Sequence, residues 1–281
     1  MVVVSWNVHV GTANVVELIR RLRAGELTGG EPVNRFVVLL QETFRAGPAV
    51  PATVPRGGRS PRAQAQGAGG LDRIDIVRIA EMLGLSLFYV PSMRNGAPPA
   101  IAEDRGNAIL STEPLSAFTA IELPFARQRR VAIAATVSGR TELGEPWSLR
   151  VASAHLESTV SARRLWVFAS RARVRQARGL LDALRPHEAL VVGGDFNTWF
   201  GYADPTYKAL VAELPDAASS DRRTTFGRLF RLDHVFARPP SGWSITAVRL
   251  DDRLGSDHHP IVARLRRASG VNGAGAGPLL Q

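Results

Sequence analysis

Polar side chains suited to phosphate-ester chemistry follow several apolar segments of this chain. Asn7 follows VVVSW, Glu42 follows FVVLLQ, and His155 follows RVASA. Asp195 follows ALVVGG, with Asn197 two residues further on. Carboxylate and amide oxygens bind hard divalent cations, a carboxylate can take a proton from water, and imidazoles hydrogen-bond to phosphoryl oxygens. The pattern therefore predicts a shared site for the hydrolysis of phosphate esters.

Further groups of the same kind stand near the C-terminus. Asp233 and His234 follow an Arg-Leu pair, and the segment GSDHHP at 255–260 precedes the apolar run IVARL. Ligand sites of α/β folds lie where strands end, because the loops there converge while the sheet holds them in place. We expect these groups to join the same site.

Each residue also has a structural interpretation when it is taken alone. Asn7 can close its own turn, Glu42 can cap the segment that follows, and His155 can be a hydrogen-bonded core histidine. Gly193 and Gly194 are compatible with a tight turn of positive φ. The joint pattern favours function, because independent strand ends should not all finish in such residues.

Short apolar segments rich in β-branched residues predict the strands that position these groups. The segments are 1–6, 36–40, 85–90, 108–110, 131–137, 149–154, 189–192, 234–237, 245–250 and 261–265. Apolar residues at helical spacing predict a helix at 13–23. Helices are also expected at 71–83 and at 161–184, the longest candidate segment. Strands that alternate with helices, followed by strands in succession, predict a layered α/β sandwich around two sheets.

Several motifs run in sequence from Trp6 to Pro260: WN at 6–7, QE at 41–42, GNAILS at 106–111, HL at 155–156, GDFN at 194–197, DHV at 233–235 and SDHHP at 256–260. In this order they resemble the endonuclease/exonuclease/phosphatase superfamily of DNase I-like metal-dependent phosphoesterases. That superfamily includes nucleases, neutral sphingomyelinases and inositol-polyphosphate phosphatases. The resemblance implies a four-layer α/β/β/α sandwich, in which two packed mixed β-sheets are flanked by helices and the site lies at one rim.

A divalent cation is expected, because hydrolysis of a phosphodiester requires charge on the phosphoryl oxygens to be neutralised. Glu42 is the first candidate ligand, since Mg²⁺ binds through one or two carboxylates and retains several waters. The resemblance implies Asn7 and Asp257 as the next ligands. We therefore expect a Mg²⁺-dependent phosphoric diester hydrolase, with Mn²⁺ as an alternative ion.

Catalytic roles can be assigned to the remaining motif residues. Asp195 suits the activation of water, with Asn197 as a neutral donor that holds the phosphate or the nucleophile. His155 and His258 are expected to stabilise the negatively charged transition state. The resemblance implies that Asp233 holds His258, fixes its tautomer and raises its pKa. An alternative in which the Asp233–His258 pair is the base stays open.

The chain departs from the family pattern at a few positions. His9 stands where many members have a small or acidic residue, and we expect it to line the rim of the site. Asp104 and Arg105 precede the GN motif in place of a Tyr-and-Glu cluster. Arg105 is a candidate for a bidentate phosphate contact, or else a surface arginine. His259 should point away from the site if the chain is extended there.

The charge balance favours a phosphate-bearing substrate. The chain has 35 Lys+Arg against 25 Asp+Glu, a formal charge of +10, and a compositional bias toward arginine is one explanation. A positive surface attracts nucleic acid, so an endo- or exonuclease acting on DNA or RNA is the expected function. The helix predicted at 161–184 carries Arg163, Arg164, Arg171, Arg173, Arg175 and Arg178, which cannot all lie on one face.

Two other functions remain open. The segment WFGY at 199–202 follows Asn197 and can stack on a base or enter a lipid surface. This segment favours a lipid-headgroup (sphingomyelinase-like) or small-molecule phosphodiesterase as the alternative. A non-catalytic relative that binds nucleic acid is the second alternative, although the full set of motif acids, amides and histidines argues against it.

Length and composition predict the organisation of the chain. A chain of 281 residues, 45% hydrophobic, suits one domain at 1–267. The Pro- and Gly-rich segment 46–70 is expected to be a flexible loop, and 268–281 a disordered tail. The absence of cysteine excludes disulfides and thiolate metal sites. With no bilayer-length apolar segment and no signal peptide, a cytoplasmic location is favoured, and we expect a monomer.

Overall fold

The computed structural model describes residues 1–47, 73–95, 103–141, 143–158 and 165–267. The predicted flexible loop at 46–70, apart from Ala46 and Gly47, and the predicted tail at 268–281 lie outside these residues. Residues 71–72 and 161–164, with which two of the predicted helices begin, lie outside them as well.

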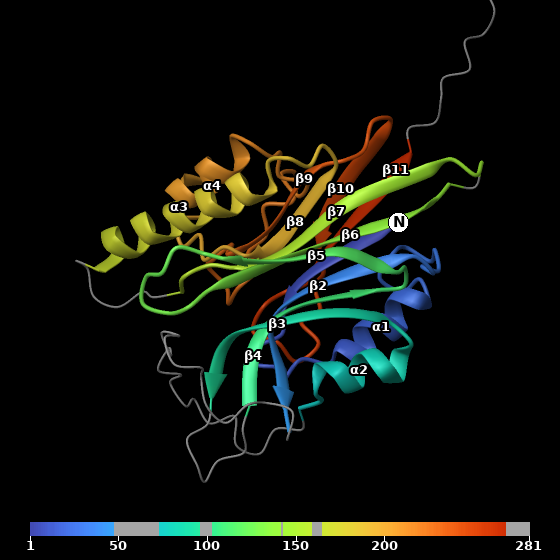
Figure 1. The fold of residues 1–281 in the computed structure, drawn as a ribbon, viewed down its shortest axis with the longest axis horizontal. Coiled ribbons are helices and arrows are strands. Elements are labelled where there is room, and N and C mark those ends of the chain that lie inside the picture. The colour runs from blue at the N-terminus through green and yellow to red at the C-terminus, as the bar shows by residue number, and fades with distance from the viewer. Residues whose placement is uncertain (48–72, 96–102, 142, 159–164, 268–281) are drawn as a thin grey trace, which may run out of the picture.

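The chain forms two mixed β-sheets (Figure 1). The six-stranded sheet has the spatial order β10 (Trp243–Arg249), β11 (Ile261–Arg267), β1 (Val2–Asn7), β2 (Phe36–Ala46), β4 (Glu103–Ser111) and β3 (Ser86–Asn95). The five-stranded sheet has the order β5 (Leu115–Glu122), β6 (Val131–Arg140), β7 (Pro146–His155), β8 (Leu190–Asp195) and β9 (Asp233–Arg238).

Helices cover the outer face of each sheet, so that the molecule has four layers. Helices α1 (Val15–Arg23) and α2 (Ile76–Leu83) pack on the six-stranded sheet, and α3 (Leu165–Leu184) and α4 (Pro205–Val211) lie over the five-stranded sheet (Figure 1). A short 3₁₀ helix, η1 (Gly201–Ala203), precedes α4. The predicted α/β/β/α sandwich is confirmed. None of the helices in the described ranges is both long enough and apolar enough to cross a membrane.

Successive side chains of a strand point to opposite faces of the sheet, and in the central strands both faces are buried. Val2 and Val4 of β1 pack with Leu18 of α1, whereas Val3 packs against the facing sheet with residues such as Val151. Both faces of β1 are therefore apolar, and the strand reads as a continuous hydrophobic run. Its C-terminal end at Asn7 is held rigidly between the two layers.

Some local predictions are corrected by the structure. The sequence predicts a helix over 71–83, whereas α2 begins at Ile76. Asp75 is its N-cap and accepts a hydrogen bond from Val77 N at 2.7 Å. Gly193 and Gly194 do not form a turn but lie within β8.

A Cβ atom on either glycine would lack space. At Gly193 it would lie 2.7 Å from Ser5 Cβ and Oγ on the facing sheet, and at Gly194 it would lie 2.1 Å from the carbonyl oxygen of Ala154. The two glycines thus allow β8 to approach its neighbours closely just before Asp195.

Candidate active site

Four of the predicted site residues lie at the carboxyl ends of two parallel strand pairs. In the six-stranded sheet β1 and β2 are paired up to Asn7 and Gln41, and Glu42 follows directly. In the five-stranded sheet β7 and β8 end at the pair of His155 and Asp195. Because the two sheets pack face to face, these ends meet at one rim, where Asn7 Nδ2 donates to Asp195 Oδ2 at 3.0 Å.

Asp195 lies at the centre of the cluster. Its Oδ2 atom, which accepts from Asn7, also lies 3.5 Å from His155 Nε2 and 3.7 Å from His258 Nε2. Its Oδ1 atom accepts a hydrogen bond from the backbone N–H of Asn197 at 3.0 Å. One carboxylate therefore connects residues from both sheets and from the loop before β11.

Asn197 shapes the loop that follows β8. It adopts a left-handed conformation with φ of 52°, which asparagine tolerates better than most residues. Its side-chain Nδ2 donates to Leu156 O at 3.1 Å, and its own carbonyl accepts from Trp199 N at 2.9 Å. The predicted contact of Asn197 with phosphate or nucleophile would have to use the second N–H of the same amide group.

Asp233 and His258 form a close, buried side-chain contact at the site. Asp233 begins β9 opposite Asp195, and its Oδ2 atom lies 2.7 Å from His258 Nδ1. The backbone of His258 is fixed on both sides, since its N–H donates to Ser256 Oγ at 3.0 Å and its carbonyl accepts from Trp6 Nε1 at 3.1 Å. The Nδ1 contact leaves the opposite ring nitrogen, Nε2, facing Asp195.

Burial and neighbouring charge set different protonation preferences in this cluster. Burial raises the pKa of Asp195 to about 7, with the charge of Asp233 acting in the same direction and His258 opposing it. Burial lowers the pKa of His258, but the carboxylates of Asp233 and Asp195 outweigh it and raise the value to about 10. Burial, together with the charges of Arg130 and His258, holds the pKa of His155 well below its usual range. His155 is therefore neutral and His258 positively charged near pH 7.

Glu42 is directed to the rim by an irregularity in β2. The register between β2 and β4 shifts between Leu40 and Thr43, and Glu42 itself has φ of 56°. Such a bulge changes the direction of a side chain at the edge of a site. The carboxylate is 25% exposed, and its Oε1 atom lies 3.4 Å from Asn7 Nδ2 and 3.8 Å from His155 Nδ1.

Asp257 and His9 lie together on the more exposed side of the cluster. Asp257 Oδ1 is 2.7 Å from His9 Nδ1 and 3.9 Å from His258 Nε2. The backbone N–H of His9 donates to Asn7 Oδ1 at 3.1 Å, and its side chain is 47% exposed. His9 thus stands at the rim and contacts two of the predicted metal ligands, Asp257 and Asn7.

Two other residues considered from the sequence lie apart from the cluster centre. Arg105 is buried in β4 and pairs with Glu103, whose Oε1 atom lies 3.2 Å from Arg105 Nη2. The ring nitrogen Nδ1 of His259 lies 2.9 Å from Leu250 O and 2.7 Å from Arg249 Nη1, so His259 faces β10. The structure does not place Arg105 or His259 in direct contact with Asp195 within the described residues.

Sequence reasoning missed Arg130, which is buried beside the site at the start of β6. Its Nη2 atom donates to Ser158 Oγ at 3.0 Å. Burial lowers its pKa, while attraction to Glu157, Glu42 and Asp195 opposes this shift. The sequence holds no signal that distinguishes Arg130 from the neighbouring Arg129, because only the packing shows which of the two is buried.

A two-sheet sandwich with a carboxylate and imidazole cluster at its rim has the architecture of the DNase I-like phosphoesterases. The sequence profile of the Endonuclease/Exonuclease/phosphatase family matches residues 4–258, and the chain belongs to this family. Its activity is accordingly that of a hydrolase acting on phosphate esters, a chemistry that in this family generally depends on a divalent metal.

Solved structures with different activities share the fold. The chain is similar to an endonuclease/exonuclease/phosphatase from Beutenbergia cavernae (22% identity, TM-score 0.60, 95% of this chain and 72% of that chain covered). It is also similar to the 3'-5' exonuclease NExo from Neisseria meningitidis (17% identity, TM-score 0.54, 94% of this chain and 99% of that chain covered). A third similar structure is sphingomyelinase C from Streptomyces griseocarneus (17% identity, TM-score 0.51, 96% of this chain and 99% of that chain covered). No curated protein sequence matches the chain significantly.

Proposed function

We propose that this protein is a Mg²⁺-dependent phosphodiester hydrolase that acts as a nuclease on DNA or RNA. The observation that carries the proposal is the position of Asp195 Oδ2, which is within 3.0–3.7 Å of Asn7 Nδ2, His155 Nε2 and His258 Nε2. A carboxylate with a pKa near 7 is suited to accept a proton from water at neutral pH. The surrounding donors are suited to the charge of a phosphoryl group.

The residues divide the reaction between them. Asp195 takes a proton from the attacking water as the water oxygen bonds to phosphorus. The ester P–O bond breaks, and its electron pair leaves with the alcohol oxygen, which takes a proton from solvent. His258, held positively charged by Asp233, and neutral His155 donate hydrogen bonds to the phosphoryl oxygens. Asn7 orients Asp195 through its amide. The raised pKa of His258 supports this assignment over the alternative in which the Asp233–His258 pair is the base.

The chemistry of the donor set fits a hard divalent ion. Asn7, Glu42 and Asp257 offer amide and carboxylate oxygens at the rim, and among the described residues no arginine or lysine lies within ion-pair distance of Glu42. A second group, formed by Asp195, Asp233 and His258, has ligand atoms within 4.8 Å of one another. We assign Mg²⁺ to the first group, because its donors are all oxygens, the ligands that Mg²⁺ prefers, whereas the second group includes the imidazole of His258. When bound, the ion neutralises charge on the phosphate.

Nucleic acid is the substrate that the surface favours. The chain carries a formal charge of +10, which attracts a polyanion. In the segment 199–202, Trp199 does not project as an apolar anchor, because its ring packs edge-on against Phe226 and Phe230 at centroid distances of 5.9 and 5.0 Å. A lipid-headgroup phosphodiesterase is the second candidate, supported by the exposed side chains of Phe200 (48%) and Leu229 (79%).

One experiment separates these functions. Purified protein is given supercoiled plasmid, sphingomyelin vesicles and bis-p-nitrophenyl phosphate, each with Mg²⁺ or with EDTA, and Asp195→Asn is tested alongside to exclude a contaminating enzyme. We expect metal-dependent nicking that is absent in the variant. Cleavage of the lipid without nicking would assign the second candidate function. Silence on all three substrates, with no Mg²⁺ binding by calorimetry, would contradict the proposal.

A further inference from the structure

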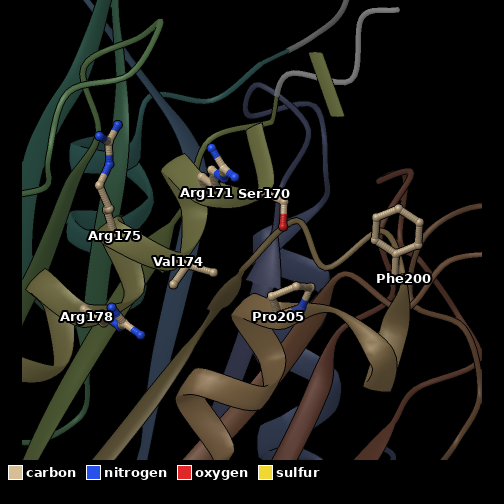
Figure 2. Close-up of a pocket in the computed structure, with 7 residues that line it drawn as sticks. All are labelled: Ser170, Arg171, Val174, Arg175, Arg178, Phe200 and Pro205. Carbon is tan, nitrogen blue, oxygen red and sulfur yellow. The ribbon is translucent and has the colours of Figure 1, made fainter. Parts of the chain in front are cut away.

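A groove outside the catalytic cluster separates α3 from the loop that follows β8. Its volume is about 640 Å³. Side chains of α3 form one side, and the loop and the start of α4 form the other (Figure 2). The lining residues are Ser170, Arg171, Val174, Arg175, Arg178, Phe200 and Pro205.

Three exposed arginines share the groove side of α3. Arg171, Arg175 and Arg178 are spaced i, i+4 and i+7, which places them on one helix face. Arg173 lies on a different face and is buried, with its Nη2 atom 4.0 Å from Asp204 Oδ2. The exposed stripe extends over about 10 Å of the helix axis. The positive helix predicted from the sequence thus does contain one arginine face.

The stripe has positive charge available for an anion. Among the described residues, no carboxylate lies within ion-pair distance of Arg171, Arg175 or Arg178. Asp182, the single acid of α3, is 3.0 Å from Arg185 instead. The groove therefore combines an apolar surface with three cations that no carboxylate of the described part of the chain neutralises.

The groove adjoins the loop that directly follows Asp195, the proposed base. Phe200, on the side facing α3, stands three residues after Asn197 (Figure 2). The loop is anchored on its other side, since Trp199 packs against Phe226, and the Phe226 ring lies 4.7 Å from the His258 ring. The loop thus connects the groove with the cluster, since Phe200 stands five residues after Asp195 in the chain.

We propose that the groove binds the single-stranded flank of a nucleic-acid substrate, an inference that rests on the proposed nuclease function. Arg171, Arg175 and Arg178 contact successive phosphates, and Phe200 stacks on a base. The apolar surface of Val174 and Phe200 suits bases and sugars better than a free inorganic anion.

Oligonucleotide binding tests the arginine stripe. In the Asp195→Asn background, fluorescence anisotropy measures the Kd of a labelled oligothymidylate about 12 nucleotides long. We expect R171Q/R175Q/R178Q to weaken binding by about tenfold or more at low salt. The slope of log K against log salt should fall by about 2, because each lost phosphate contact on a single strand is worth roughly 0.7.

A matched control removes the same charge far from the groove. R140Q/R266Q/R267Q alters exposed arginines, and Arg140 is paired with Pro146 at the end of β7 opposite His155. We expect this control to retain most of the affinity and slope of the parent. An equal loss in the control and groove variants would overturn the proposal, because net charge alone would then explain binding.

A variant of Phe200 distinguishes nucleic-acid binding from binding to a lipid surface. F200L keeps an apolar side chain but removes the ring, so it should weaken oligonucleotide binding by about tenfold and leave association with phosphatidylserine vesicles unchanged. If the arginine variant instead lost vesicle binding and kept oligonucleotide binding, the groove would be a membrane site and the proposal wrong.

Hydrolysis of bis-p-nitrophenyl phosphate keeps the two proposals distinguishable. The groove variants, made with Asp195 intact, should hydrolyse this small diester at the parent rate, because it does not reach the groove. If the parent protein hydrolyses neither this diester nor the plasmid nor the vesicles and binds no Mg²⁺, the proposed function fails. Normal hydrolysis with unaltered oligonucleotide binding in R171Q/R175Q/R178Q would overturn the groove alone.

Discussion

Asp195 and Asp233 are buried carboxylates that face each other across β8 and β9, yet their surroundings differ. Asp233 has the imidazole of His258 at 2.7 Å, whereas the two imidazoles near Asp195 are 3.5 and 3.7 Å away. The unequal distances fit the proposed division of roles, in which Asp233 stabilises the His258 cation and Asp195 accepts a proton. Roles at the residue scale thus follow from placement rather than from residue type.

Replacement of the proposed base should remove activity without weakening the fold. Asp195→Asn should lower kcat on bis-p-nitrophenyl phosphate by about 10²–10⁴. Its melting temperature at pH 8 should be unchanged or higher, because burial disfavours the charged form of Asp195. Asp182→Asn, an exposed acid on α3, is the control. Turnover at the parent rate in Asp195→Asn would exclude Asp195 as the base.

The carboxylate of Asp221 should make folding stability depend on pH. The hydrogen bond from Arg223 lowers the pKa of Asp221, and the backbone N–H groups of Arg249 and Arg223 add to this. A lowered folded pKa stabilises the protein above the unfolded value of about 3.9, and the contribution is lost as pH falls through the folded value. Asp221→Asn should therefore reduce the free energy of unfolding by about 1–3 kcal/mol at pH 7.

Urea denaturation at two pH values measures this linkage. The difference between Asp221→Asn and the parent should shrink below about pH 4, where the carboxylate begins to be protonated in the unfolded chain. A difference of the same size at neutral and acid pH would mean that shape, and not charge, explains the effect.

At the scale of elements, the sequence predicts those strands and helices whose buried faces produce a regular pattern of apolar residues. The central strands are recognisable because both of their faces are apolar, whereas β5 is missed because most of its residues are exposed. Helix α4 is missed because seven residues carry little periodicity, although Asp204 and Pro205 mark its start. Arg130 is missed for a related reason, because only its burial and its hydrogen bond to Ser158 in the folded chain distinguish it from the adjacent arginine.

The close approach of the sheets near the site gives a prediction for Gly193. A Cβ atom there would lie 2.7 Å from Ser5 Cβ and Oγ, so Gly193→Ala should lower the free energy of unfolding by about 1–3 kcal/mol. Ser5→Gly removes the opposing atoms, and the double variant should be destabilised by less than the sum of the two single changes. Additive effects in urea denaturation would show that the two positions do not conflict.

At the scale of the whole molecule, the site collects residues from strands that lie far apart in the chain. The parallel strand pairs β1–β2 and β7–β8 each bring site residues to the rim from their carboxyl ends, one pair in each sheet. Asp233 begins β9, and His258 precedes β11. Each sheet alone holds only part of the cluster, so the site exists only when the two sheets are packed together. A ligand that bridges both sheets should therefore stabilise the complete fold.

Mg²⁺ held by Asn7, Glu42 and Asp257 should also stabilise the folded chain, and its effect should depend on Glu42. A ligand that binds only the folded state stabilises it by about 2.7 kcal/mol at a concentration of 100 times Kd. The melting temperature of the parent should therefore rise with Mg²⁺ and fall back with EDTA. Glu42→Gln should melt near the parent in EDTA but gain little from Mg²⁺, whereas Glu122→Gln, an exposed acid of β5, should respond as the parent does. An equal gain in Glu42→Gln would remove Glu42 from the metal site.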